Sequence, residues 1–205
     1  MASPIAHSFA GFWTFLIFAN RLRIRLLEQW RQYLPELILV ILLANLPDFD
    51  FFISLAVLGN DHLHRELTHS LVAGAFVALT FACVWRITKR FWESVILYFT
   101  AYGSHLLIDF CTGNKLGLTR SGSGIPLLWP SHKEFSSPLI LFPGVRHGTL
   151  GAIFSMDNLW TALYELLTFG AITVIVLALR ALLLRQENYA SPSRTEQHEL
   201  FPTFK

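Results

Sequence analysis

The stretch that decides the fold is WTALYELLTFGAITVIVLAL, residues 160–179, an apolar run whose one charged residue is Glu165. A helix of about 20 residues is ~30 Å long, which matches the hydrocarbon core of a bilayer. The run is rich in leucine and alanine and does not alternate between apolar and polar residues, which favours a helix over a strand. It therefore predicts a membrane-spanning helix.

The composition of the chain agrees with a membrane protein. Hydrophobic residues make up 53% of the 205 residues and charged residues 15%, against about 25% charged residues in an ordinary soluble domain. A disordered chain is excluded. The net charge of +2 gives no sign of a surface that binds nucleic acid. The two cysteines, Cys83 and Cys111, cannot form a disulfide framework.

Four more apolar stretches precede residues 160–179, at 9–19, 34–58, 70–85 and 94–108. Together they predict an all-α integral membrane bundle of about five helices, of which four or five cross the bilayer, and strands are not expected. Some runs are short, so buried core helices of a soluble protein are the alternative. We expect one membrane-embedded domain over residues 1–185 with one long polar loop at 111–157, and a disordered polar tail at 186–205.

The basic residues predict the orientation in the membrane. If the five stretches cross and their connections alternate between sides, eleven of the 16 basic residues fall on one side and five on the other. The positive-inside rule places the richer side in the cytoplasm. The C-terminus is then cytoplasmic, and the N-terminus and the long loop face outward.

Histidines and aspartates gather at the outer ends of these stretches. His105 and Asp109 are four residues apart on one helix, so an imidazole and a carboxylate share one face and can reach one ion. Burying such a pair at the end of an apolar helix is costly, which makes it a functional candidate. The same end of the topology holds the other candidates: His7, Asp48, Asp50, His64 and His69. The sequence predicts that they form one cluster at or just below the outer membrane face.

Two local patterns refine this prediction. In LPDFD (46–50), Pro47 breaks the helix. If the backbone is extended there, Asp48 and Asp50 point to opposite faces, so that one can bind a metal while the other orients a histidine. Thr68 or Ser70 can cap the helix that follows His69. Considered without the other candidates, His7 is equally an ordinary surface histidine. Asp48 or Asp50 alone is equally a residue that caps a helix.

Four motifs resemble those of the YdjM-like family of membrane-bound metal-dependent hydrolases of the bacterial inner membrane. They are LPDFD (46–50), HRELTHS (64–70), SHLLIDFCT (104–112) and GIPLLWP (124–130), and the resemblance covers about residues 7–130. It implies a metal site made of His7, Asp48, Asp50, His64, His69, His105 and Asp109. Arg65, Thr68 and Ser70 match the second motif, whereas NKLGLTRSGS (114–123) departs from the family pattern as an insertion.

A more distant similarity is to zinc-dependent phospholipase C, in which metal ligands follow one another in the same order. Here that order is given by His7, Asp48, His69, His105 and Asp109. The second, histidine-rich half of that enzyme's site has no counterpart, so a full three-metal site is not expected.

The donor set predicts the chemistry. Imidazoles and carboxylates without thiolates suit one or two divalent ions, with Zn²⁺ first and Mn²⁺ or Fe²⁺ as alternatives. Asp50 or Glu66 is a candidate general base, and Arg65, Lys115 and Arg120 can bind a phosphate. We expect a hydrolase that cleaves a phosphoester or similar bond of a lipid or membrane-associated substrate. A structural metal site and a metal-ion carrier or sensor are the alternatives. Membrane lipids are the expected partners; nucleic acid is not, and no protein partner can be inferred.

Overall fold

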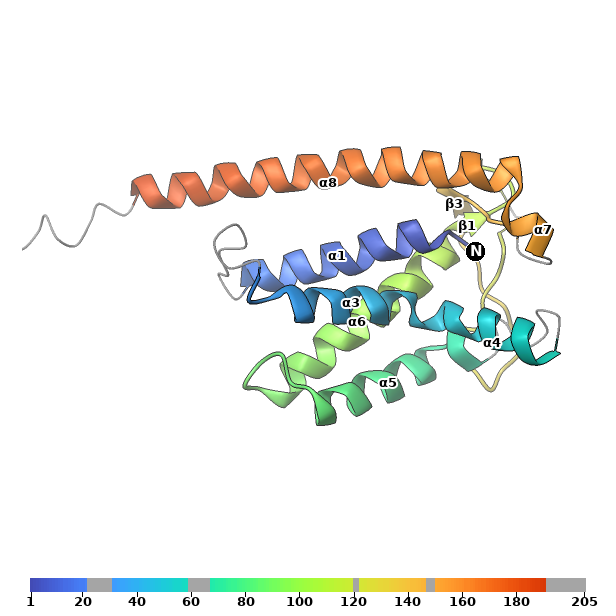
Figure 1. Cartoon of the computed structure of the whole chain (residues 1–205), viewed down its shortest axis with the longest axis horizontal. Coiled ribbons are helices and arrows are strands. Elements are labelled where there is room, and N and C mark those ends of the chain that lie inside the picture. The colour runs from blue at the N-terminus through green and yellow to red at the C-terminus, as the bar shows by residue number, and fades with distance from the viewer. Residues whose placement is uncertain (22–30, 59–66, 120–121, 147–149, 191–205) are drawn as a thin grey trace, which may run out of the picture.

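The computed structural model describes residues 1–21, 31–58, 67–119, 122–146 and 150–190, and these are mostly helical (Figure 1). Among them are five helices of twelve residues or more: α1 (Pro4–Arg21), α3 (Leu34–Asn45), α5 (Leu71–Val84), α6 (Phe91–Phe110) and α8 (Met156–Ala190). Shorter helical elements are η1 (Leu46–Asp48), α4 (Phe49–Leu58), η2 (Leu67–His69) and α7 (Leu150–Ile153). The prediction of a mainly helical chain with about five long helices is confirmed.

Helices α1, α3, α5 and α6 form a bundle with one apolar core. Its buried side chains include Phe15, Val40, Leu43, Ala78, Leu97 and Tyr98. Helices α1 and α3 approach each other closely at Gly11, where an added Cβ would lie 2.9 Å from the Cα of Ile41. Helix α8 runs alongside α1 and continues past the end of the bundle (Figure 1).

The predicted break at Pro47 is present and has a specific shape. Proline lacks a backbone N–H and its ring clashes with the preceding turn, so α3 ends at Asn45. The chain then makes the 3₁₀ turn η1, which contains Asp48, and enters α4, whose first turn contains Asp50. The backbone is therefore helical here, and the extended conformation considered from the sequence is not adopted.

The long connection after α6 is folded. Strand β1 (Thr112–Gly113) pairs in parallel with β4 (Phe142–Pro143), and β2 (Gly117–Leu118) pairs antiparallel with β3 (Leu139–Ile140). Ile125 and Ile140 are buried. The expectation of no strands is wrong for this loop, because strands of two residues are too short to show an alternating pattern in the sequence.

One helix in the described part of the chain is long and apolar enough to cross a membrane, namely α8 over Met156–Leu183. Only 6% of its most apolar window is buried, unlike the core helix of a soluble protein. Helices α1 and α5 are apolar but shorter. Of the four or five predicted crossings, α8 is the one described helix that qualifies by length and composition. The stretch 34–58 does not qualify because Pro47 divides it into two short helices.

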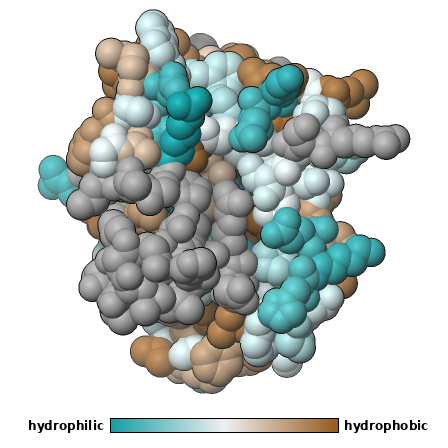
Figure 2. Space-filling view, turned by 90° about the vertical axis from the view of Figure 1, so that its right-hand side faces the viewer, coloured by the Kyte–Doolittle hydropathy of each residue, from teal (hydrophilic) through white to brown (hydrophobic). Residues whose placement is uncertain are grey.

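Helices α1 and α8 begin at the same end of the molecule (Figure 1). Figure 2 shows this end from outside: its described surface is largely hydrophilic or neutral, and the hydrophobic residues lie mostly toward the edges. Figure 1 shows that the folded loop and the end of α6 lie here too.

Candidate metal centre

Five elements bring histidines and aspartates together at this end of the bundle. His7 lies in the first turn of α1, and Asp48 lies in η1. His69 ends η2, and Asp50 lies in the first turn of α4. Helix α6 contributes His105 and Asp109 from its last two turns. The predicted convergence of these segments is what the structure shows.

Four of these side chains each place one ligand atom within 4.8 Å of all the others: His7, Asp48, His105 and Asp109. The Nε2 of His105 lies 3.5 Å from Asp48 Oδ1 and 3.5 Å from Asp109 Oδ2. The Nε2 of His7 lies 3.5 Å from Asp109 Oδ1 and 3.7 Å from Asp48 Oδ2. The i, i+4 spacing on α6 thus does bring His105 and Asp109 to one point.

His69 adjoins this group of four. Its Nε2 lies 3.5 Å from Asp109 Oδ2, 3.6 Å from Asp48 Oδ1 and 3.2 Å from the Nε2 of His105. A third imidazole nitrogen therefore faces the same two carboxylates. We refer to His7, Asp48, His69, His105 and Asp109 as the His/Asp cluster.

The His/Asp cluster is buried and lacks hydrogen bonds that its atoms require. His7, His69, His105 and Asp109 have no exposed surface, and the side chain of Asp48 is 14% exposed. Both ring nitrogens of His7, Oδ1 of Asp48 and Oδ2 of Asp109 are buried with no hydrogen-bond partner. Leaving such atoms unpaired costs ~1–3 kcal/mol each, and more for charged groups.

A divalent cation would satisfy these atoms. Separations of 3.5–3.7 Å are too long for good hydrogen bonds. They fit ligand atoms that share one ion, since two ligands each ~2.1 Å from a tetrahedral ion are themselves ~3.4 Å apart. Two carboxylates would also balance the charge of a divalent ion. The residues present therefore fit a metal.

Outer contacts orient two of the cluster's side chains. The Nδ1 of His105 lies 2.9 Å from the carbonyl oxygen of Ala44 and donates to it, which leaves the lone pair on Nε2 facing the cluster. The backbone N–H of Ala2 donates to Asp109 Oδ1 at 3.0 Å. Metal-binding histidines and carboxylates commonly have such partners.

Asp50 occupies a different position from Asp48. Its carboxylate accepts a hydrogen bond from the Thr68 hydroxyl, and its Oδ2 lies 3.6 Å from the Nδ1 of His69. Because Nδ1 is on the side of the ring away from the cluster, this position suits orientation of His69 better than ligation. It corresponds to the second of the two roles that the sequence left open for the aspartates.

The carboxylates shift the titration of their neighbours. Burial opposes a charge on His69, but its contacts with Asp109, Asp48 and Asp50 outweigh burial and raise the pKa of His69 to about 10. In the absence of a cation, the carboxylates are balanced by a proton on this imidazole, which metal binding would displace.

The segment around His69 is fixed by three further contacts. Ser70 is the N-cap of α5 and accepts the N–H of Ala73 at 3.1 Å, as one of the two caps considered from the sequence. The Tyr102 hydroxyl donates to the carbonyl oxygen of Thr68. The N–H of Leu71 donates to the carbonyl of Leu127 in the folded loop at 3.0 Å. Tyr102 could not be singled out from the sequence, because it is one of many aromatic residues and has no distinctive spacing.

Of the remaining predicted site residues the structure describes only Lys115, which lies outside the cluster. Lys115 is exposed between β1 and β2. His64, Arg65, Glu66 and Arg120 lie outside the described residues. Their roles as ligand, base or phosphate-binding groups stay predictions.

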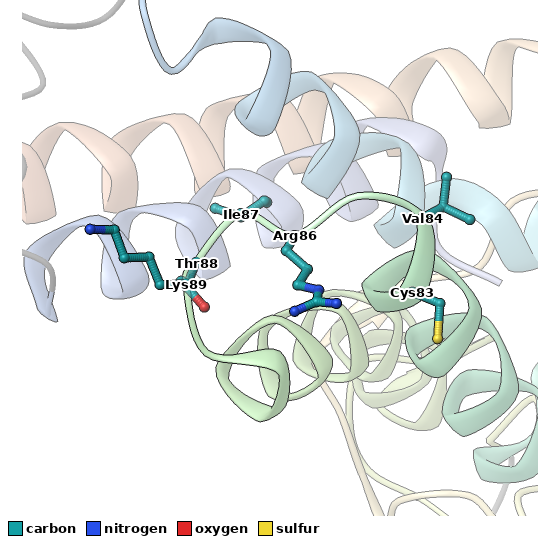
Figure 3. A pocket seen from close by; sticks show the side chains of 6 residues that line it. All are labelled: Cys83, Val84, Arg86, Ile87, Thr88 and Lys89. Atoms are coloured by element: carbon teal, nitrogen blue, oxygen red, sulfur yellow. The ribbon is translucent and has the colours of Figure 1, made fainter.

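A surface hollow lies at the opposite end of the bundle from the cluster. It is formed at the turn between α5 and α6 and is lined by Cys83, Val84, Arg86, Ile87, Thr88 and Lys89 (Figure 3). His69 precedes the start of α5 and Asp109 lies near the end of α6, so both helices separate the hollow from the cluster. This hollow is not part of the candidate site.

Comparison with known proteins identifies the family. No curated protein and no solved structure matches the chain. The model of the YdjM inner membrane protein family matches residues 1–186, which include the whole His/Asp cluster and all but the last four residues of α8. The chain therefore belongs to the YdjM inner membrane protein family.

Proposed function

We propose that this protein is a metal-dependent hydrolase of the bacterial inner membrane that cleaves a phosphoester or similar bond of a lipid or membrane-associated substrate. The observation that carries the proposal is the buried group of His7, Asp48, His105 and Asp109, whose ligand atoms lie within 4.8 Å of one another. Several of these atoms have no hydrogen-bond partner. A cation accounts for both facts.

The donor set supports Zn²⁺ first, with Mn²⁺ or Fe²⁺ as alternatives and room for one or two ions. Such an ion lowers the pKa of a bound water toward ~7 and so supplies hydroxide at neutral pH. The role of the chain's own residues is to hold the ion and to orient the side chains that bind it. His105 is fixed by Ala44, Asp109 by the N–H of Ala2, and His69 by Asp50.

Access and proton transfer involve the edge of the cluster. Asp48 is its one member with exposed surface, so we place the approach of water and substrate on that side. Asp50 and Glu66 stay the candidate general bases, and the carboxylate of Asp50 accepts a hydrogen bond from the Thr68 hydroxyl. Arg65, Lys115 and Arg120 are the candidate phosphate-binding residues.

The surface of α8 supports a place in the membrane. Its buried face is a narrow and partly polar stripe with members three or four residues apart: Asn158, Thr161, Glu165, Phe169 and Thr173. The rest of the helix exposes large apolar residues, including Leu167, Val174, Ile175 and Leu182. A surface helix of a soluble protein has the reverse arrangement. The exposed face of α8 is therefore suited to lipid.

The bundle helices share this property, which supports several crossings. Phe76 and Val84 on α5 and Trp92 and Ile96 on α6 are more than half exposed. Trp160 and Arg180 are ~30 Å apart along α8, which matches the hydrocarbon thickness with an aromatic residue at one interface. Glu165, about 1.4 turns beyond Trp160, accepts a hydrogen bond from Ser3 near the cluster, so the cluster lies close to that interface.

The orientation is testable separately. With the C-terminus cytoplasmic, the cluster and the folded loop face the periplasm. In a background with Cys83 and Cys111 replaced by serine, a cysteine at Lys115 should react with a membrane-impermeant maleimide in intact spheroplasts. Protection of that cysteine until the membrane is permeabilised would reverse the orientation without affecting the cluster.

A hydrolysis assay tests the reaction. Purified protein, stripped of metal and reloaded with Zn²⁺ or Mn²⁺, is incubated with phospholipids and with model phosphomonoesters and phosphodiesters. We expect metal-dependent release of product that is lost in Asp48→Asn. A protein that binds metal but cleaves none of these bonds would favour the second candidate, a structural metal site, for which the full burial of His7, His105 and Asp109 is the supporting observation.

A further inference from the structure

Glu165 is a buried carboxylate for which the proposed reaction has no use. It is the one charged residue in the apolar run 160–179, and it has no exposed surface. A carboxylate on a membrane helix is costly and is seldom present without a role. The sequence shows this residue plainly, but it lies some sixty residues after the last ligand motif and has no spacing partner.

Both oxygens of Glu165 bind Ser3. The backbone N–H of Ser3 donates to Oε1 at 3.0 Å, and the Ser3 hydroxyl donates to Oε2. Ser3 also caps α1, because its Oγ accepts the N–H of Ile5 at 3.1 Å. Glu165 therefore fixes the residue at which α1 begins.

Ser3 is connected to two members of the His/Asp cluster. Its carbonyl oxygen accepts the backbone N–H of His7 at 3.4 Å, in the first turn of the helix that presents this imidazole. The adjoining residue, Ala2, donates its N–H to Asp109 Oδ1 at 3.0 Å. One carboxylate on α8 thus holds the segment that orients both His7 and Asp109.

We infer that Glu165 is a positioning residue of the metal site: through Ser3 it sets the positions of His7 and Asp109 and makes α8 part of the site's support. This inference rests on the metal site of the proposed function but not on hydrolysis. Residues that orient metal ligands typically contribute about 10–100-fold to metal affinity.

A second polar contact between α1 and α8 separates this role from simple helix packing. The Nε1 of Trp13 donates to Thr173 Oγ1 at 2.7 Å. Thr173 is two turns further along α8 than Glu165, ~12 Å from it. Loss of the Trp13–Thr173 hydrogen bond weakens the packing of α1 on α8 but leaves the contacts of Ser3 unchanged, so Thr173→Val is a matched control.

The test is a Co²⁺ titration of the full chain in detergent, with affinity measured by competition against a chromophoric chelator and with the visible spectrum of the bound Co²⁺ recorded. We expect Glu165→Leu to weaken binding about 10–100-fold and to alter the spectrum. Glu165→Gln should restore most of the affinity, because its amide can accept from the Ser3 N–H and donate to the Ser3 hydroxyl. Thr173→Val should bind as the wild type does.

Ser3→Ala is the second variant in case Glu165→Leu does not fold. It leaves α8 intact and removes the hydroxyl contact with Glu165 and the cap on the N–H of Ile5, but it keeps the contact of the Ser3 N–H with Oε1, so we expect a smaller loss of affinity. Wild-type affinity and spectrum in both Glu165→Leu and Ser3→Ala would overturn the inference while leaving the metal site in place. An equal loss in Thr173→Val would also overturn it, since helix packing would then explain the effect. Absence of binding by the wild type would remove the metal site and the inference together.

Discussion

The Nδ1 of His105 lies 2.9 Å from the carbonyl oxygen of Ala44, so the imidazole that points into the cluster from α6 is held by the end of α3. A carbonyl oxygen only accepts, and Nδ1 must therefore carry the proton. The unprotonated Nε2 then faces Asp48 and Asp109 at 3.5 Å from each. The break at Pro47 thus serves the site twice, since it ends α3 beside His105 and begins the turn that presents Asp48.

The two aspartates of LPDFD should respond differently to replacement. Asp48→Ala removes the two oxygens that face His7 and His105, so we expect bound metal to be lost. Asp50→Ala removes a group that contacts the outer nitrogen of His69, so we expect metal to be retained with affinity reduced about 10–100-fold. Metal analysis after dialysis, together with affinity titration, checks both. Equal loss in the two variants would mean that Asp50 is a ligand.

Removal of metal should lower the thermal stability of the protein. The bare cluster leaves the nitrogens of His7 and an oxygen of each of Asp48 and Asp109 unpaired. A ligand present at a hundred times its dissociation constant stabilises by ~2.7 kcal/mol, which corresponds to roughly 5–10 °C in Tm for a chain of this size. Differential scanning fluorimetry in detergent, with chelator and after readdition of Zn²⁺, measures the shift. A Tm that is indifferent to chelator would contradict the metal site.

Two tyrosines on α6 form a matched pair for testing the support of His69. Tyr102 donates to the carbonyl of Thr68 at the cluster end of α5, and Tyr98 donates to the carbonyl of Trp85 at the other end, at 2.6 Å. Either Tyr→Phe variant should lose about 0.5–1.5 kcal/mol of stability. Only Tyr102→Phe should weaken metal binding, because only Thr68 adjoins His69. Equal affinities for both variants would show that this contact does not support the site.

Gly11 provides a test of the close approach between α1 and α3. A Cβ there would lie 2.9 Å from Ile41 Cα and 3.0 Å from Ala44 Cβ, so Gly11→Ala forces the helices apart. We expect a loss of about 1–3 kcal/mol and weaker metal binding, because α1 carries His7 and Ala44 holds His105. Gly170→Ala on α8, where nothing lies within 4 Å, should be neutral or slightly stabilising. The two are compared by thermal unfolding and by metal titration.

Much of the site could be predicted from the sequence because its signals are local. The four-residue spacing of His105 and Asp109 fixes a shared helix face, and Pro47 fixes a break between α3 and α4. The conformation of that break could not be predicted, because a proline permits both an extended and a 3₁₀ continuation. The observed turn places Asp48 in the cluster and Asp50 behind His69.

The features that the sequence did not predict depend on tertiary packing. Glu165 contacts Ser3, 162 residues earlier in the chain, and no local spacing indicates such a contact. Strands β1–β4 are two residues each and follow from how the loop packs on the end of α6, where Ser137 and Leu141 donate to the carbonyls of Phe110 and Cys111. Among the described helices only α8 qualifies as a span by length and composition, and the shorter apolar helices also line the bundle core, so apolar runs alone do not fix the number of crossings.

The central claim is that the His/Asp cluster binds a metal ion. Its most direct test is the metal content of detergent-purified wild type beside the His105→Ala/Asp109→Ala double variant, measured by inductively coupled plasma mass spectrometry after loading with Zn²⁺ or Mn²⁺. The account predicts about one or two equivalents of metal in the wild type and none in the double variant. Wild-type protein without metal, or a double variant that retains it, would contradict the account.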